Sequence, residues 1–189
     1  MLRPIAMALI HYPVVDRRGN LVTSAVTNLD IHDLARLATT YGLSRLYLVT
    51  PVLEQQHLVQ RIIRHWSEGF GASYNRDRSQ ALRLVKVCND YLAALEDWRR
   101  LAGDDMAALL TGARQRQGLG FRHARKVAQS KPLLIFLGTG HGLAEEFYDR
   151  GWAQLLALRV AGYNHLSVRT AAAIILDRLV GERGRPLIV

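Results

Sequence analysis

The chain has 189 residues, of which 49% are hydrophobic and 22% are charged. These proportions are typical of a folded globular protein and exclude an intrinsically disordered one, and the length suits a single domain over residues 1–189. Lysine and arginine total 25 against 16 aspartate and glutamate residues, which gives a formal net charge of +9. This excess indicates a polyanionic partner, although the same charge can serve solubility alone.

Cysteine and histidine usage limits the chemistry that the chain can perform. Cys88 is the single cysteine, so an intrachain disulfide and a cysteine-rich zinc site are both excluded, and we expect a reducing cytoplasm. The seven histidines show no spacing with carboxylates that predicts a metal site. No apolar run approaches the roughly 20 residues that cross a bilayer, so we expect neither a metal nor a membrane span.

In chain order, the first half of the sequence alternates apolar runs with helical periods. An apolar run predicts a strand at 5–10, and Asn28 or Asp30 can cap a following helix that closes at Gly42. A second strand is predicted at 45–50, a helix at about 53–66, a strand at 82–87 and a helix at about 90–101. The polar stretch 69–79 is predicted to be a long loop or an excursion that contacts a polyanion.

The second half continues in the same way. We predict a strand near 107–111, a helix near 121–128, a strand at 133–137, a helix at about 143–148, a strand at about 155–160 and a closing helix at 167–180. Strands that alternate with helices predict an α/β fold with a mostly parallel sheet covered on both faces. Ligands of such sheets lie beyond the carboxyl ends of the strands.

The closing helix is apolar nearly all the way round between residues 171 and 176. A helix of this kind is buried on all sides, either under a neighbouring loop or against a second subunit. On this basis the sequence predicts a homodimer.

The most specific segment is the strand at 133–137, which runs directly into Gly138, Gly140 and Gly142. Alternating glycines permit unusual backbone angles and a close approach to a ligand. A dinucleotide fingerprint is disfavoured, because Leu143 stands where its third glycine would be and the segment lies late in the chain. Taken alone, the segment could also be a glycine-rich turn without a ligand.

A second segment, residues 156–176, reads as a strand, a polar loop and an apolar helix capped by Ser167. Together, Leu-Gly-Thr-Gly-His-Gly-Leu at 137–143 and Asn-His-Leu-Ser-Val-Arg-Thr-Ala-Ala-Ala-Ile at 164–174 resemble the second and third conserved motifs of the SPOUT methyltransferases. The resemblance implies a C-terminal trefoil knot around a site for S-adenosylmethionine (SAM). Knots are otherwise nearly absent from proteins.

The resemblance extends over residues 4–182, and is strongest in His-Tyr-Pro-Val at 11–14 and Thr-Asn-Leu-Asp-Ile-His-Asp-Leu-Ala-Arg at 27–36. Here the chain is similar to a bacterial family of SAM-dependent RNA methyltransferases. Carried over by position, the family's cofactor-binding residues would be Thr111, Leu137, Gly138, Thr139, Gly140, Gly142, Leu158, Val160, Gly162, Asn164, His165, Leu166 and Ser167.

A methyltransferase needs one base beside the methyl acceptor. The catalytic candidates near the end of the first strand are Arg17, Asn28, Asp30 and His32, with His11 and Arg18 beside them. Each has an ordinary alternative: Asp30 can cap a helix, His32 can be a surface histidine, and the arginines can bind phosphate or be solvated.

Residues 106–144 contain no acidic residue, which suits contact with phosphates. The predicted RNA-binding residues in this segment are Arg114, Arg116, Arg122, Arg125 and Lys126. The leading hypothesis is SAM-dependent methylation of tRNA or rRNA, and the alternative is a non-catalytic RNA-binding or dimerisation module with the same fold. A small-molecule enzyme would leave the basic segment unexplained.

Overall fold

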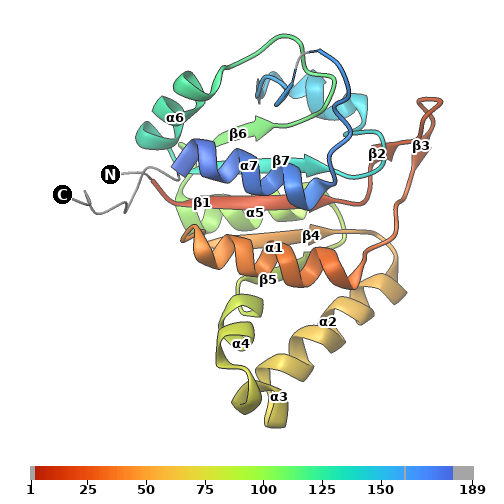
Figure 1. Cartoon of the computed structure of the whole chain (residues 1–189), viewed down its shortest axis with the longest axis vertical. Helices are drawn as coiled ribbons and strands as arrows, with labels where there is room; N and C mark the ends of the chain where they lie inside the picture. The colour runs from red at the N-terminus through yellow and green to blue at the C-terminus, as the bar shows by residue number, and fades with distance from the viewer. Residues whose placement is uncertain (1–2, 160, 181–189) are drawn as a thin grey trace.

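The computed structural model describes residues 3–159 and 161–180. At its centre lies a six-stranded sheet in which neighbouring strands are parallel (Figure 1). Across the sheet the strands are β5 (Val85–Cys88), β4 (Arg45–Val49), β1 (Ile5–Ile10), β7 (Leu133–Gly138), β6 (Ala107–Leu110) and β8 (Ala153–Gln154). The predicted α/β class with a mostly parallel sheet is confirmed.

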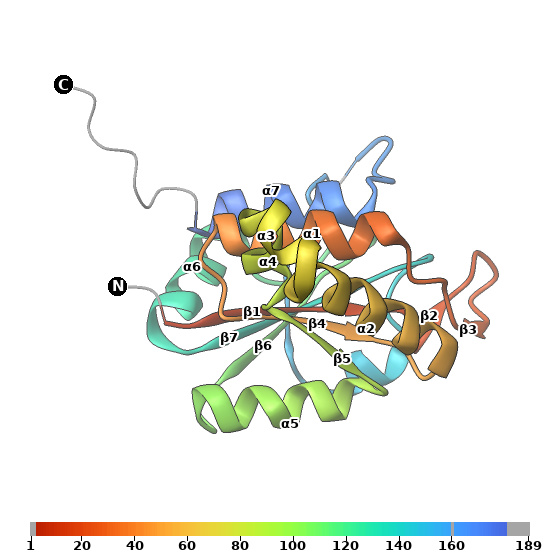
Figure 2. The same ribbon diagram turned by 90° about the horizontal axis from the view of Figure 1, so that it is seen from below.

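Helices cover both faces of the sheet. Figure 2 shows α5 (Tyr91–Ala102) on one face and α1 (Asn28–Thr40) and α7 (Val168–Val180) on the other. The remaining helices are α2 (Leu53–Ser67), α3 (Gly69–Tyr74), α4 (Arg76–Leu82), α6 (Phe121–Ser130) and the 3₁₀ helix η1 (Glu145–Arg150). This arrangement leaves the ends of the strands open to ligands.

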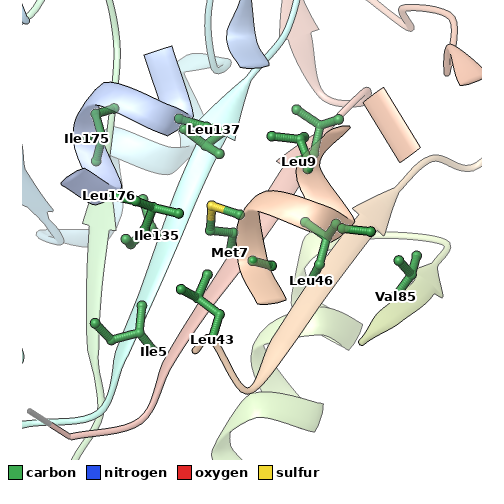
Figure 3. Packing of buried hydrophobic residues seen from close by; sticks show 14 of the residues in the cluster. Ile5, Met7, Leu9, Leu43, Leu46, Val85, Ile135, Leu137, Ile175 and Leu176 are labelled. Atoms are coloured by element: carbon green, nitrogen blue, oxygen red, sulfur yellow. The ribbon is translucent and has the colours of Figure 1, made fainter. Parts of the chain in front are cut away.

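The central strand β1 shows why the fold needs helices on both faces. Its residues are all buried, and they alternate between the two faces because successive side chains of a strand point in opposite directions. Met7 and Leu9 pack in the cluster under α1 and α7, whereas Ala6 and Ala8 pack in the cluster under α5. Figure 3 shows Met7 and Leu9 among apolar side chains of neighbouring strands and of α7.

The α5 face holds large buried aromatic side chains, among them Trp98, Phe136 and Phe147. Phe136 lies in β7 and Phe147 lies in η1, and their ring centres are 5.5 Å apart. Aromatic pairs of this kind contribute roughly 1 kcal/mol beyond the burial of their area. The contact fixes the chain that follows the glycine-rich segment against the sheet.

The first residues of α1 correct one prediction. Thr27, and neither Asn28 nor Asp30, caps the helix: its Oγ1 accepts a hydrogen bond from the backbone N of Asp30 at 3.1 Å. Thr27 adopts the extended conformation that a cap requires, while Asn28 is already helical. The predicted end is confirmed, because α1 stops at Thr40 and Gly42 follows with φ of +66°.

The stretch 69–79 was predicted to be a loop, and this prediction is wrong. Two short helices, α3 and α4, occupy it and pack against α1 and α2. A side-chain carbon at Gly71 would collide with the carbonyl oxygen of His65 at the end of α2. The helices therefore depend on a close tertiary contact that the periodicity of so short a segment does not reveal.

Other elements also differ from the prediction, and the strand predicted at 82–87 is β5 at Val85–Cys88, because Leu82 belongs to α4. The edge strand is β8 at Ala153–Gln154, before the predicted 155–160, and the predicted helix at 143–148 is the more tightly wound 3₁₀ helix η1 at Glu145–Arg150. A hairpin of two short strands, β2 (Val14–Val15) and β3 (Leu21–Val22), was not predicted. Strands of two residues are too short to show an alternating pattern.

The predicted trefoil knot concerns the path of the chain between β8 and α7. That path includes residue 160, which lies outside the described residues, and the knot stays a prediction. In the part of the chain that the structure describes, no helix is long and apolar enough to cross a membrane.

Candidate functional site

A cavity of about 680 Å³ lies at the carboxyl ends of β6 and β7. This is where parallel α/β sheets bind ligands, and the volume falls within the range of roughly 300–1,000 Å³ that is usual for small-molecule sites. The walls comprise the loops after β6, β7 and β8 and the first turns of α1 and α7. They are formed by Ser24, Ala25, Asp30, Thr111, Gly112, Ala113, Arg114, Leu137, Gly138, Thr139, Gly140, His141, Gly142, Leu155, Leu156, Ala157, Leu158, Asn164, His165, Leu166, Ser167, Val168, Ala171 and Ile175.

One wall is the glycine-rich loop, residues 138–143, which the segment after β1 holds in place. The carbonyl oxygen of Ile10 accepts the backbone N–H of Thr139 at 3.2 Å, and that of Val15 accepts the N–H of His141 at 2.9 Å. Val15 in turn donates its own N–H to the carbonyl oxygen of Gly142 at 3.0 Å. These hydrogen bonds fix the loop without using the side chains that face the cavity.

Glycine is required in this loop at all three positions, and Gly142 has φ of +120°, which residues with a side chain rarely adopt. A side-chain carbon at Gly138 would lie 2.7 Å from the backbone nitrogen of Leu143, which is closer than such atoms approach. Gly140 has φ of +58°, and a side-chain carbon there would lie 3.0 Å from the carbonyl oxygen of Val15. The tight turn and the close approach of residues 14–15 thus explain the other two glycines.

The opposite wall consists of residues 155–158 and 164–167, which Asn164 ties to the loop after β6. The side-chain amide of Asn164 donates to the carbonyl oxygens of Ala113 at 2.9 Å and Arg159 at 2.8 Å. Ala157 donates its backbone N–H to the carbonyl oxygen of Gln115 at 2.9 Å. The two loops therefore form one continuous wall.

Asp30 brings a carboxylate to the cavity. It is 8% exposed, and its Oδ2 accepts a hydrogen bond from the hydroxyl of Thr27 at 2.5 Å. The guanidinium of Arg169 lies 3.9 Å from Oδ1 of Asp30 and 3.6 Å from the carboxylate of Asp33. A carboxylate at the edge of an apolar cavity can accept a proton from a bound molecule.

His11 is fully buried directly after β1, behind the glycine-rich loop. Burial disfavours the charged imidazolium and lowers the pKa of His11 to about 4, although the nearby charge of Asp30 acts in the opposite direction. The imidazole is therefore neutral at physiological pH.

The predicted cofactor-binding residues lie together in the structure. Those that line the cavity are Thr111, Leu137, Gly138, Thr139, Gly140, Gly142, Leu158, Asn164, His165, Leu166 and Ser167. Gly162 is not among the lining residues and lies in an exposed turn with φ of +76°. Val160 lies outside the described residues.

The predicted catalytic residues are not brought together. Asp30 lines the cavity, whereas Asn28 is exposed at the first position of α1 and Arg17 is exposed in the turn of the β2–β3 hairpin. His32 lies on another side of α1, where its ring meets that of Trp66 with centres 6.1 Å apart. Burial and the positive charge of Arg78 lower the pKa of His32.

The predicted RNA-binding residues divide in a similar way. Arg114 lines the cavity, and Arg116, Arg122 and Lys126 are exposed on the loop after β6 and on α6. Arg125 is half-buried, and its guanidinium donates to the carbonyl oxygen of Arg178 at 2.6 Å. This contact joins α6 to α7, so Arg125 has a structural role.

Comparison with known families identifies the chain. A family model described as "SAM-dependent RNA methyltransferase" matches residues 4–181. The chain belongs to this family. The predicted resemblance is therefore confirmed, and a family that uses SAM agrees with the predicted cofactor.

One relative of this chain that has a functional name is a longer protein. A protein from Oleidesulfovibrio alaskensis named tRNA (guanine-N(1)-)-methyltransferase is 42% identical over 181 residues, which cover 95% of this chain but 43% of the relative. A relative from Aquifex aeolicus is 34% identical over 179 residues, which cover 93% of this chain and 87% of the relative. The chain thus spans less than half of the named relative and most of the other.

Solved structures show the same fold at low identity. A probable methylase family protein from Haemophilus influenzae superposes with a TM-score of 0.61 at 20% identity, over 96% of this chain and 66% of that one. A TrmH/SpoU tRNA modifying enzyme from Aquifex aeolicus gives a TM-score of 0.58 at 15% identity, over 97% of this chain and 76% of that one. The fold is that of the SPOUT-type methylases.

The sequence did not predict several of the residues that line the cavity. Ser24 and Ala25 come from the connection between β3 and α1, and Ala171 and Ile175 come from α7. The helical period assigned Ile175 to a buried face, and nothing in it distinguishes contact with a cavity from contact with the core. Ser24 carries no local signal, because only the folded chain brings it beside the glycine-rich loop.

Proposed function

We propose that this chain transfers the methyl group of SAM to a nucleotide of tRNA, and that the cavity beyond β6 and β7 holds SAM. The observation that carries this proposal is the enclosure of one cavity by the glycine-rich loop and the segment tied down by Asn164. Membership of a SAM-dependent RNA methyltransferase family supports it.

The residues of the cavity fit SAM chemically. Leu137, Leu155 and Leu158 supply apolar walls for the adenine, and the loops 138–142 and 164–167 supply backbone groups for its polar edges. When bound, SAM supplies a methyl group that its sulfonium has already activated for displacement. The protein then has to align the acceptor and remove its proton.

Asp30 is the base in this proposal. Its carboxylate lines the cavity, and Oδ2 is engaged by Thr27, whereas Oδ1 lies 3.9 Å from the guanidinium of Arg169, beyond hydrogen-bond distance, and keeps its lone pairs for the acceptor. An oxygen or nitrogen of the nucleotide forms a bond to the methyl carbon as the carbon–sulfur bond breaks, and the acceptor's proton passes to Oδ1 of Asp30. Of the four catalytic candidates, Asp30 is retained, and Arg17, Asn28 and His32 are not placed at the cavity.

The choice of tRNA rests on the names of the relatives. The relative named tRNA (guanine-N(1)-)-methyltransferase is matched over 43% of its length, so its named activity enters here as a proposal. The exposed basic residues of the loop after β6 and of α6, Arg114, Arg116, Arg122 and Lys126, would contact the phosphates. Such a substrate places the protein in the cytoplasm.

We propose further that the chain forms a homodimer through α7. Ala173 and Ile174 are half-buried on this helix, although the helix is apolar nearly all round. Leu166 and Tyr163, which precede α7, are 44% and 81% exposed. A second subunit would cover these side chains.

Titration with S-adenosylhomocysteine, the product of SAM after methyl transfer, tests the cofactor site. We expect binding to the wild-type protein in the micromolar range by calorimetry, and at least a tenfold loss for Ala171→Phe, because the new ring would fill the cavity. Ala72→Phe is the control: Ala72 is equally half-buried, lies on α3 and does not line the cavity. Wild-type protein that binds no ligand at millimolar concentration would end the proposal.

Incubation with labelled SAM and total RNA tests the transfer itself. Incorporation of label into tRNA supports the enzyme. Binding of ligand and RNA without incorporation would instead favour the non-catalytic RNA-binding module.

A further inference from the structure

A chain of hydrogen bonds links buried His11 to the cavity. Nδ1 of His11 lies 2.9 Å from Oγ of Ser24, which lies 2.5 Å from Oγ1 of Thr139. Oγ1 of Thr139 lies 2.9 Å from the carbonyl oxygen of Ile10. Ser24 and Thr139 both line the cavity, and they lie 115 positions apart in the sequence.

The direction of every hydrogen bond in this chain follows from its last member. A carbonyl oxygen can only accept, so the hydroxyl hydrogen of Thr139 points to Ile10. Ser24 then has to donate to Thr139, and Nδ1 of His11 has to donate to Ser24. His11 is therefore the neutral tautomer with its proton on Nδ1.

The same reasoning shows whether the hydroxyls of Ser24 and Thr139 can donate or accept hydrogen bonds toward a ligand. Each has given its only hydrogen to a neighbour, and each retains lone pairs. Toward the cavity, Ser24 and Thr139 can accept hydrogen bonds but cannot donate them. The ligand group that meets them must be a donor.

Among the described residues, the side chain of His11 makes no hydrogen bond other than the one to Ser24. It is fully buried, and its Nε2 has no hydrogen-bond partner in the described part of the structure. A buried polar residue with one ring nitrogen unpartnered costs free energy, so a purely packing role would be better served by an apolar side chain. The remaining nitrogen, Nδ1, donates to Ser24 and completes the chain of hydrogen bonds that the carbonyl oxygen of Ile10 directs.

We infer that His11 is a positioning residue for the methyl-donor site: it acts through Ser24 and Thr139 to present an acceptor-only pair of hydroxyls, which selects an N–H group of the bound ligand. This inference rests on the proposed function, because it takes SAM as the ligand. Two amino groups of SAM have suitable N–H donors, the one on adenine and the one on the amino-acid end.

Paired substitutions test the role of Nδ1. In His11→Asn the amide nitrogen can occupy the place of Nδ1, whereas in His11→Gln it reaches the place of Nε2. We expect His11→Asn to bind S-adenosylhomocysteine within about twofold of wild type, and His11→Gln to bind about five- to tenfold more weakly. Equal affinities for the two variants would overturn the inference.

Ser24 offers a milder pair, because it lies only partly buried at the cavity. We expect Ser24→Ala to lose about five- to tenfold in affinity and Ser24→Thr, which keeps the hydroxyl, to retain it. Ser73→Ala is the control, since its hydroxyl donates to the carbonyl oxygen of Phe70 on exposed α3. Loss of affinity in Ser24→Thr equal to that in Ser24→Ala would count against the hydroxyl's role.

Analogues of the ligand test whether the hydroxyls of Ser24 and Thr139 act only as acceptors. Removal of one of the two amino groups from S-adenosylhomocysteine should weaken binding to wild type, and this loss should shrink in Ser24→Ala. Wild-type binding that neither removal affects would overturn the acceptor-only assignment.

Nitrogen-15 NMR of the imidazole separates this inference from the proposed function. The spectrum of the unliganded wild type should show a protonated Nδ1 and an unprotonated Nε2 for His11 at neutral pH. The opposite tautomer would overturn the inference even if the ligand binds. Absence of ligand binding together with the expected tautomer would reject the proposed cofactor alone.

Discussion

Asp30 belongs both to the first turn of α1 and to the wall of the cavity. It lies in the first turn of α1, where its backbone N–H is satisfied by Thr27, and its side chain also forms part of the cavity wall. Because Thr27 holds Oδ2, the carboxylate has little rotational freedom. The cap therefore holds one carboxylate oxygen, while Oδ1 lies 3.9 Å from the guanidinium of Arg169.

Replacement of this carboxylate by an amide should remove the base without removing the hydrogen-bonding shape. For Asp30→Asn we expect kcat for methyl transfer to fall by about 10²- to 10⁴-fold, with ligand affinity changed by less than about threefold. Asp33→Asn is the matched control, because Asp33 contacts the same Arg169 but is exposed and does not line the cavity. Single-turnover transfer to tRNA measures both, and similar losses in the two variants would remove Asp30 from catalysis.

At the residue scale, the spacing of Asp30 and His32 along a helix separates these two catalytic candidates. Successive residues of an α-helix are rotated by about 100°, so Asp30 and His32 leave α1 in nearly opposite directions. The structure places Asp30 at the cavity and His32 against Trp66. What the sequence could not reveal was which side of α1 the cavity occupies, since that depends on α7 and the glycine-rich loop.

Among the elements, those with a strong local signal were predicted best. Continuous apolar runs marked β1, β4 and β7 because both faces of a central parallel strand are buried. The glycine-rich loop was visible because its backbone geometry excludes side chains at Gly138 and Gly140. Helix α3 and the β2–β3 hairpin were missed because each is short: α3 packs on its chain neighbours α2 and α4, and β2 depends on hydrogen bonds to the distant glycine-rich loop.

The loop after β6 and α6 carry exposed basic side chains: the loop begins at the cavity with Arg114, and α6 packs against the C-terminal end of α7. We expect Arg116→Glu with Arg122→Glu to weaken tRNA binding at least tenfold and to lower the slope of log affinity against log salt by about 2, since each arginine releases roughly one counterion. Filter binding over a series of salt concentrations measures the slope.

Arg99→Glu with Arg100→Glu is the control for this pair. Both arginines are exposed near the end of α5, on the opposite face of the sheet, and the change in net charge is the same. An equal loss in both double variants would show that net charge alone, and not this loop with α6, attracts RNA.

At the scale of the whole molecule, the apolar surface of α7 predicts the assembly state. We expect light scattering at micromolar concentration to give twice the chain mass for the wild type, and one chain mass for Ile174→Asp, because the charge would be buried at the interface. Leu92→Asp on α5, where Leu92 is 46% exposed, should remain a dimer. A monomeric wild type would contradict the prediction.

The order of strands has a consequence for how the protein is made. β1 lies in the middle of the sheet, and its residue Ile5 pairs with Leu133 of β7. A ribosome that synthesises the chain exposes one unpaired edge of β1 until β7 emerges, and contacts of such long sequence separation slow folding. The wall supplied by α7 is synthesised later still, so the cavity is complete only after Ile175 has left the ribosome.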